Sequence, residues 1–137
     1  MVTAVAADGE LCGMTMSAVS SLSLNPPQFL ACMDNRAKTL AAVEHSKAFC
    51  IHYLSHEQQE LSNHFARPAD DRFTGVSFRI GSVGAPIIEG VIAYVECRLA
   101  HVLPGGDHSI VIGDAVHGDV LGGAPLAYYH GGYHNLG

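Results

Sequence analysis

Gly-Met-Thr-Met-Ser-Ala-Val-Ser-Ser-Leu-Ser-Leu-Asn-Pro-Pro-Gln-Phe-Leu, residues 13–30, is the stretch of this sequence that says most about fold and function. Small hydroxyl side chains crowd into a segment that otherwise reads as a β-strand, and a core has no need of them, because each buried hydroxyl requires a hydrogen-bond partner. Side chains alternate between the two faces of a strand, so one side is expected to carry Thr15, Ser17, Ser21 and Ser23. Such a row of donors and acceptors suits an anion or a flat polar heterocycle.

The composition points to a small protein with more apolar surface than one copy can bury. The chain has 137 residues, of which 48% are hydrophobic and 15% charged. This length predicts one domain, residues 1–137, with a single core. We expect a homo-oligomer, most simply a homodimer, because a domain of this size cannot cover so much apolar surface alone.

The charge of the chain argues against two classes of partner. A net charge of −6 disfavours nucleic acid and anionic membrane surfaces. The sequence has no apolar run long enough to span a bilayer and no segment typical of a secretion signal. We therefore expect a cytoplasmic protein that does not bind membranes.

The rest of the sequence predicts many antiparallel strands and little helix. Apolar residues on either side of Asp8-Gly9 predict a hairpin, and Ser55 and Gln58 form a capping box at the start of a helix. Strands are expected over residues 1–6, 11–16, 28–33, 48–54, 91–102 and 109–120, and short helices over 38–44 and 55–64. This pattern predicts a mostly β protein, an antiparallel barrel that is closed or nearly closed and hides its edges.

The cysteines and histidines do not predict a metal site. The thiols are dispersed in apolar settings without a Cys-x-x-Cys pair, so we expect reduced side chains at Cys12, Cys32, Cys50 and Cys97. The pairs His52/His56 and His130/His134 have the i, i+4 spacing of helical ligands, but neither pair lies in a convincing helix.

A second polar segment, Asp-Asn-Arg-Ala-Lys-Thr-Leu at residues 34–40, leads into the first short helix. Backbone N–H groups at a helix N-terminus are free, and with the helix dipole they favour an anion. Lys38 would add positive charge and Thr39 a hydroxyl donor. From the residues alone, a solvated helix start is the alternative, and no glycine-rich dinucleotide fingerprint is present.

Four blocks of the sequence, in order and spanning nearly the whole chain, resemble the flavin reductases that supply reduced flavin to two-component monooxygenases. The first is the hydroxyl run with its Thr-x-Ser-Ala pattern and Pro-Pro ending, followed by the loop of residues 34–39. The others are Asn63-His64-Phe65-Ala66, Gly106-Asp107-His108-Ser109-Ile110, and the closing Pro-Leu-Ala-Tyr-Tyr-His-Gly-Gly-Tyr at residues 125–133.

The resemblance implies a split β-barrel of the FMN-binding type that transfers hydride from NADH or NADPH to FMN or FAD. It makes His108 a candidate for the nicotinamide side with Tyr133 nearby, and the reduced flavin then leaves for a monooxygenase. The alternatives are a turn histidine that hydrogen-bonds to Asp107 and a tail whose aromatic rings only pack. The residues that the resemblance places at the flavin are Thr15, Met16, Ser17, Ala18, Ser21, Asp34, Lys38, Thr39, Phe65, Ala66, Tyr128 and Tyr133.

Two departures from the family pattern stand out. The family usually begins with a helix before the first strand, and this chain begins almost in that strand. A basic residue often stands beside the glycines of the tail, where this chain has His130-Gly131-Gly132-Tyr133. Two alternatives to a reductase stay open: a flavin carrier or sensor of the same fold without turnover, and a β-barrel oligomer without a cofactor.

Overall fold

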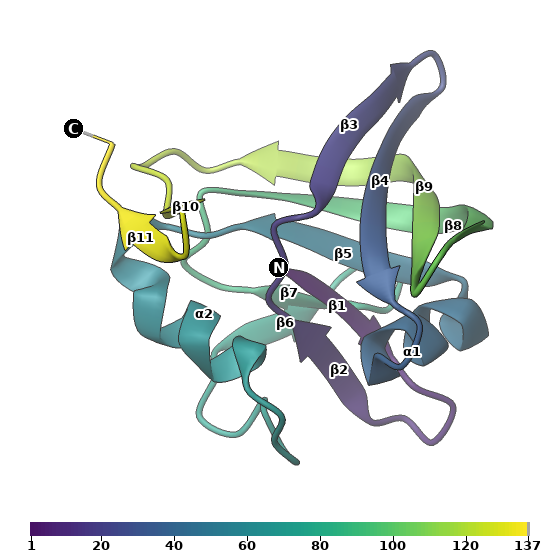
Figure 1. Cartoon of the computed structure of the whole chain (residues 1–137), viewed down its shortest axis with the longest axis horizontal. Helices are drawn as coiled ribbons and strands as arrows, with labels where there is room; N and C mark the ends of the chain where they lie inside the picture. The colour runs from purple at the N-terminus through teal and green to yellow at the C-terminus, as the bar shows by residue number, and fades with distance from the viewer. Residues whose placement is uncertain (137) are drawn as a thin grey trace.

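The computed structural model describes residues 1–136, and its main element is one seven-stranded antiparallel sheet (Figure 1). The strands of this sheet are β1 (Val2–Val5), β2 (Leu11–Met14), β3 (Val19–Leu24), β4 (Pro27–Asp34), β5 (Ala48–Tyr53), β8 (Ala93–Gly105) and β9 (His108–Val120). Their order in space is β2-β1-β5-β8-β9-β4-β3, so β2 and β3 are the two edges.

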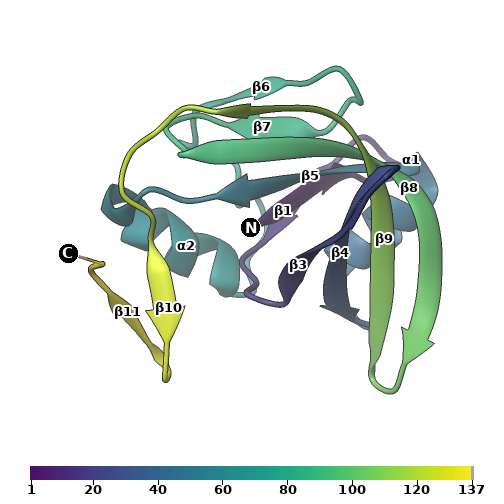
Figure 2. The ribbon, with the colours of Figure 1, turned by 90° about the horizontal axis from the view of Figure 1, so that it is seen from above.

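The two edge strands are consecutive in the sequence, and this determines the shape of the sheet. Only residues 15–18 link the end of β2 to the start of β3. An extended chain advances at most about 3.5 Å per residue, so this link keeps the two strand ends within roughly 18 Å of each other. The sheet therefore curls round into a barrel that is split between β2 and β3 (Figure 2). The predicted mostly β split barrel with short helices is confirmed.

One part of the sequence prediction is wrong: the hydroxyl run is not a single continuous strand. It breaks at residues 15–18, because β2 pairs with β1 and β3 pairs with β4, at opposite edges of the sheet. The hydroxyls of residues 15 and 17 therefore do not share a strand face with those of residues 21 and 23. The hydroxyl residues predicted to lie along one strand instead lie in a link, residues 15–18, and in the edge strand β3 that follows it.

Three helical segments and two small hairpins surround this sheet. They are α1 (Lys38–Ser46), η1 (His56–Gln58), α2 (Gln59–Ala66), and the paired strands β6 (Phe78–Ile80) with β7 (Pro86–Ile88) and β10 (Ala127–Tyr129) with β11 (Gly132–His134). The capping box is present as predicted, since Ser55 Oγ accepts from Glu57 N and Gln58 Oε1 accepts from Ser55 N. Within residues 1–136 no helix is both long and apolar enough to cross a bilayer.

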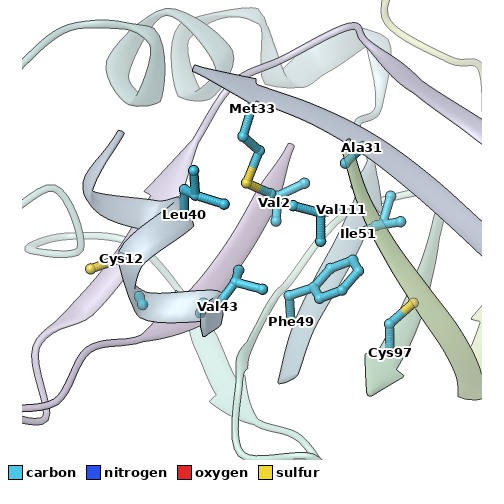
Figure 3. Close-up of a cluster of buried hydrophobic side chains, with 12 residues drawn as sticks. Val2, Cys12, Ala31, Met33, Leu40, Val43, Phe49, Ile51, Cys97 and Val111 are labelled. Atoms are coloured by element: carbon cyan, nitrogen blue, oxygen red, sulfur yellow. The ribbon is translucent and has the colours of Figure 1, made fainter. Parts of the chain in front are cut away.

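The core lies inside the curled sheet, beneath α1 (Figure 3). Leu40 and Val43 of α1 pack with Phe49 of β5 and their neighbours, all almost completely buried. Gly113 on β9 makes room for the ring of Phe49, because a Cβ at Gly113 would lie 2.5 Å from Phe49 Cζ. The four cysteines are free thiols, and burial raises the pKa of Cys97 to about 12, so this thiol is inert.

A buried histidine joins two layers of the fold. His52 on β5 is 2% exposed, and its Nε2 accepts a hydrogen bond of 3.0 Å from the backbone N–H of Ile88 on β7. Burial lowers the pKa of His52 to about 3, because a charged imidazole has no solvation there and protonated Nε2 cannot accept. The folded chain therefore holds this imidazole neutral.

We predict that the free energy of unfolding falls as the pH drops below about 6.5, the ordinary pKa of histidine. Below this pH the imidazole of His52 binds a proton in the unfolded chain but stays neutral in the folded chain, so protons favour the unfolded state. At about pH 5 the loss from this one residue is about 2 kcal/mol, and it continues until the pH reaches the folded pKa. Urea unfolding at about pH 7 and pH 5 measures it. The variant His52→Gln should lose this pH dependence, whereas His101→Gln, at an exposed position, should keep it. An unchanged pH dependence in His52→Gln contradicts the assignment.

Candidate functional site

Two cavities lie on either side of the link formed by residues 15–18, and both are lined by Thr15 and Ala66. The helix cavity, about 550 Å³, is bounded by β2, the N-terminus of α1 and the loop of residues 67–72. The tyrosine cavity, about 570 Å³, is bounded by the link, α2 and the β10–β11 hairpin. Each is of the size that proteins use for small-molecule ligands.

Hydrogen bonds hold the link between the cavities in place. Thr15 Oγ1 donates to the carbonyl of Ser62 on α2 at 2.5 Å, and the Thr15 backbone N–H donates to the carbonyl of Phe65 at 3.3 Å. At the other end, the carbonyl of Ala18 accepts from the N–H of Cys32 on β4 at 2.9 Å. The wall common to both cavities is therefore fixed to α2 and to β4.

The helix cavity has the donors of an anion site. Ala37 stands at the N-cap of α1 and has no side-chain oxygen to cap the first turn. Thr39 is only 3% exposed and lines the cavity. A threonine hydroxyl beside the N–H groups of a helix N-terminus and the Lys38 ammonium fits a phosphate group.

Both arginines at this cavity bond to protein groups. Arg72 Nη1 donates to the carbonyl of Gly13 at 2.6 Å and to that of Phe65 at 3.2 Å, which ties the loop of residues 67–72 to β2 and α2. The side chain and backbone N–H of Arg36 both donate to Asp34 and lower the pKa of its carboxyl. The carboxylate of Asp34 is thus hydrogen-bonded and ion-paired to Arg36.

The tyrosine cavity combines apolar and aromatic walls with a hydrogen bond between two of its polar side chains. Leu54, Met16 and two tyrosines line it, and the rings of Tyr128 and Tyr133 meet edge to face at 5.3 Å between centroids. The hydroxyl of Tyr133 lies 2.7 Å from Ser62 Oγ, which fastens the β10–β11 hairpin to α2. Flat aromatic walls with a few fixed polar groups suit a flat heterocycle.

The structure brings most of the predicted flavin residues together and divides them between the two cavities. Lys38, Thr39 and Phe65 line the helix cavity, and the tyrosine cavity is lined by Met16, Ser17, Tyr128 and Tyr133. Neither cavity is lined by Ala18, Ser21, Asp34 or His108.

His108 lies apart from the cavities within one chain. It stands at the β8–β9 turn, where its Nδ1 is 2.8 Å from Asp107 Oδ1, and it pairs in register with Asp34. In both overall views this turn and the β10–β11 hairpin that carries Tyr133 lie on opposite sides of the molecule (Figures 1 and 2). The role of His108 at the nicotinamide stays a prediction.

Sequence reasoning missed two features of the site. Ser62 holds both Thr15 and Tyr133, but a lone serine in a helix gives no signal in the sequence. Arg72 and the loop before it line the helix cavity, although Arg67-Pro68-Ala69-Asp70-Asp71 reads only as a solvated loop. Among residues 1–136 no three His, Cys, Asp or Glu side chains are grouped to hold a metal ion.

Comparison with known families agrees with this site. The model of the flavin reductase like domain matches residues 1–137, and the chain belongs to this family. A probable flavin reductase of Rhizobium meliloti is 38% identical over 133 residues, which are 97% of this chain but 43% of that protein. A flavin reductase (NADH) of Kitasatospora aureofaciens is 38% identical over 137 residues, covering 97% of this chain and 72% of that protein.

Solved structures share the fold. Nitrilotriacetate monooxygenase component B from Mycobacterium thermoresistibile superposes with a TM-score of 0.94 at 32% identity, covering 99% of this chain and 77% of that one. The chain therefore spans less than half of the Rhizobium relative and about three quarters of these other two proteins. The resemblance first seen in four sequence blocks is confirmed at the level of the family.

We predict that Lys38→Ala and Thr39→Val each weaken FMN binding about ten- to a hundredfold. Each removes one donor to the phosphate, and a hydrogen bond to a charged group contributes roughly 1.5–3 kcal/mol. Titration followed by quenching of flavin fluorescence measures the affinity. Lys47→Asn is the matched control, because Lys47 has the same charge at the far end of α1 and a left-handed backbone that asparagine tolerates. Unchanged affinity in both variants contradicts the placement.

We also predict that Tyr133→Phe weakens flavin binding several-fold. The variant keeps the ring but removes the hydroxyl that lies 2.7 Å from Ser62, so the hairpin is held less firmly over the tyrosine cavity. Hydrogen exchange of residues 127–134 should quicken at the same time. Tyr129→Phe serves as the control, because Tyr129 is 73% exposed and lines neither cavity. A loss of affinity as large in Tyr129→Phe contradicts this role of the Tyr133 hydroxyl.

Proposed function

We propose that this protein is an NAD(P)H-dependent flavin reductase, which reduces FMN or FAD by hydride transfer. The observation that carries the proposal is the pair of cavities joined at Thr15, one with the donors for a phosphate and the other with aromatic walls for a flat ring. The names of the relatives, flavin reductase (NADH) and monooxygenase component B, support it.

The residues of the chain position the reactants and take no covalent part. The nicotinamide supplies the hydride and the flavin ring accepts it, so the chemistry belongs to these two groups. The N-terminus of α1, Lys38 and Thr39 hold the phosphate, while the Tyr133–Ser62 bond keeps the hairpin over the ring and limits entry of water. Holding two reactants in a reactive geometry is itself a large share of catalysis.

Partners of the protein belong to the same proposal. Reduced flavin leaves for a flavin-dependent monooxygenase, a role supported by the name of the structural relative. We propose a homodimer, because Leu24 is 95% and Val120 82% exposed and β3 pairs only with β4 among the described residues. Free buried thiols suit a reducing compartment, and we place the protein in the cytoplasm.

Oxidation of NADH and of NADPH, followed by absorbance with FMN or FAD added, tests the proposed function. We expect turnover with at least one nicotinamide and one flavin. The variant His108→Ala should raise KM for the nicotinamide or lower kcat while flavin affinity stays near wild type, if the β8–β9 turn serves the nicotinamide as the family resemblance implies.

Two experimental outcomes would contradict the proposed function or the proposed role of His108. A protein that binds flavin tightly but oxidises neither nicotinamide is a carrier, and the reductase proposal then fails. A His108→Ala variant that loses flavin affinity, with KM for the nicotinamide unchanged, would move His108 to the flavin site.

A further inference from the structure

Arg72 bonds to both of the elements that meet where the link begins. Its Nη1 donates to the carbonyl of Gly13 on β2 at 2.6 Å and to that of Phe65 on α2 at 3.2 Å, and its own carbonyl accepts from His64 Nε2 at 2.6 Å. Gly13 lies so close to α2 that a Cβ there would be 2.9 Å from Phe65 Cε1. The guanidinium therefore holds two elements that are already in contact, and a shift of either one would lengthen one of its hydrogen bonds.

These bonds reach the link through a shared carbonyl. The carbonyl of Phe65 accepts from Arg72 Nη1 and also, at 3.3 Å, from the backbone N–H of Thr15, the first residue of the link. The other acceptor, Gly13, is on the strand that leads directly into Thr15. Arg72 thus fixes the end of β2 relative to the last turn of α2, and the position of the link depends on both.

The same guanidinium has a donor that it does not use within the chain. Arg72 Nε is buried and has no hydrogen-bond partner among residues 1–136. A buried donor without an acceptor lowers stability, and departures of this kind are concentrated at functional sites. Stability alone therefore does not explain why an arginine stands here.

We propose that Arg72 is a positioning residue for the flavin site, which acts through the carbonyls of Gly13 and Phe65 and so fixes the link between the two cavities. The inference rests on the proposed function, which puts the flavin ring in the tyrosine cavity and its phosphate in the helix cavity. Arg72 lines the helix cavity and not the tyrosine cavity, whereas Thr15 lines both. Loss of Arg72 should therefore weaken binding of the ring as well as of the phosphate, whereas a residue that only attracts the phosphate would affect the phosphate end alone.

Riboflavin, which is FMN without its phosphate, separates these two roles. Titration followed by flavin fluorescence should show that Arg72→Met weakens riboflavin and FMN at least about tenfold each, by factors that agree within about threefold. Lys38→Ala should weaken FMN at least about tenfold more than riboflavin, because Lys38 acts on the phosphate. Arg67→Met is the matched control. It removes the same charge from the same loop, but Arg67 is exposed and lines neither cavity, so both affinities should stay at their wild-type values.

Two further variants test the route through the link. Arg72→Lys keeps the charge but puts it on a flexible stem instead of a rigid planar group, so it should weaken both ligands, by less than Arg72→Met does. This variant also carries the test if Arg72→Met does not fold. Thr15→Val removes the hydroxyl bond that fixes the link to Ser62. Combined with Arg72→Met, it should weaken riboflavin by less than the product of the two single losses, because both variants release the same segment.

Several results would overturn the proposal. A folded Arg72→Met variant that loses FMN affinity but keeps wild-type riboflavin affinity would make Arg72 a phosphate ligand. Wild-type affinity for both ligands, or a double variant whose loss equals the product of the single losses, would also contradict a positioning role. These measurements do not depend on turnover. A protein that shows equal losses for riboflavin and FMN but oxidises neither NADH nor NADPH keeps Arg72 in this role and refutes the reductase.

Discussion

The four residues that join β2 to β3 impose the constraint on which the rest of the structure depends. They connect the two edges of a seven-stranded sheet, so the sheet has to curl until its edges nearly meet. The link cannot pair with either edge along its length, and it is fixed instead by Thr15, which bonds to Ser62 and Phe65 on α2. The split in the barrel is thus bridged by a short polar segment fastened to a helix.

The two cavities follow from this arrangement. The link separates the helix cavity at the N-terminus of α1 from the tyrosine cavity at the β10–β11 hairpin. The elements around each cavity determine which chemical groups line it. The helix end supplies N–H groups, the hydroxyl of Thr39 and positive charge, whereas the hairpin supplies aromatic rings and one hydrogen bond to α2. A nucleotide has this same division between an anionic end and a flat ring.

Local patterns in the sequence predicted the elements well, because alternation and capping residues act over short distances. The hairpin around Asp8-Gly9, the capping box at Ser55 and the helix after Asp34 all form as expected. The break in the hydroxyl run was missed, since nothing local states that β2 and β3 pair at opposite edges. Ser62 and Arg72 were missed for a similar reason, because their partners lie far away in the sequence.

A crystal structure of the protein soaked with FAD tests the central claim most directly, since that claim concerns where one ligand lies relative to the link. We expect the flavin ring in the tyrosine cavity beneath Tyr133, a phosphate within hydrogen-bond distance of Thr39 Oγ1 at the N-terminus of α1, and Thr15 between them. Flavin bound elsewhere, such as at the β8–β9 turn beside His108 with both cavities left to solvent, would contradict it.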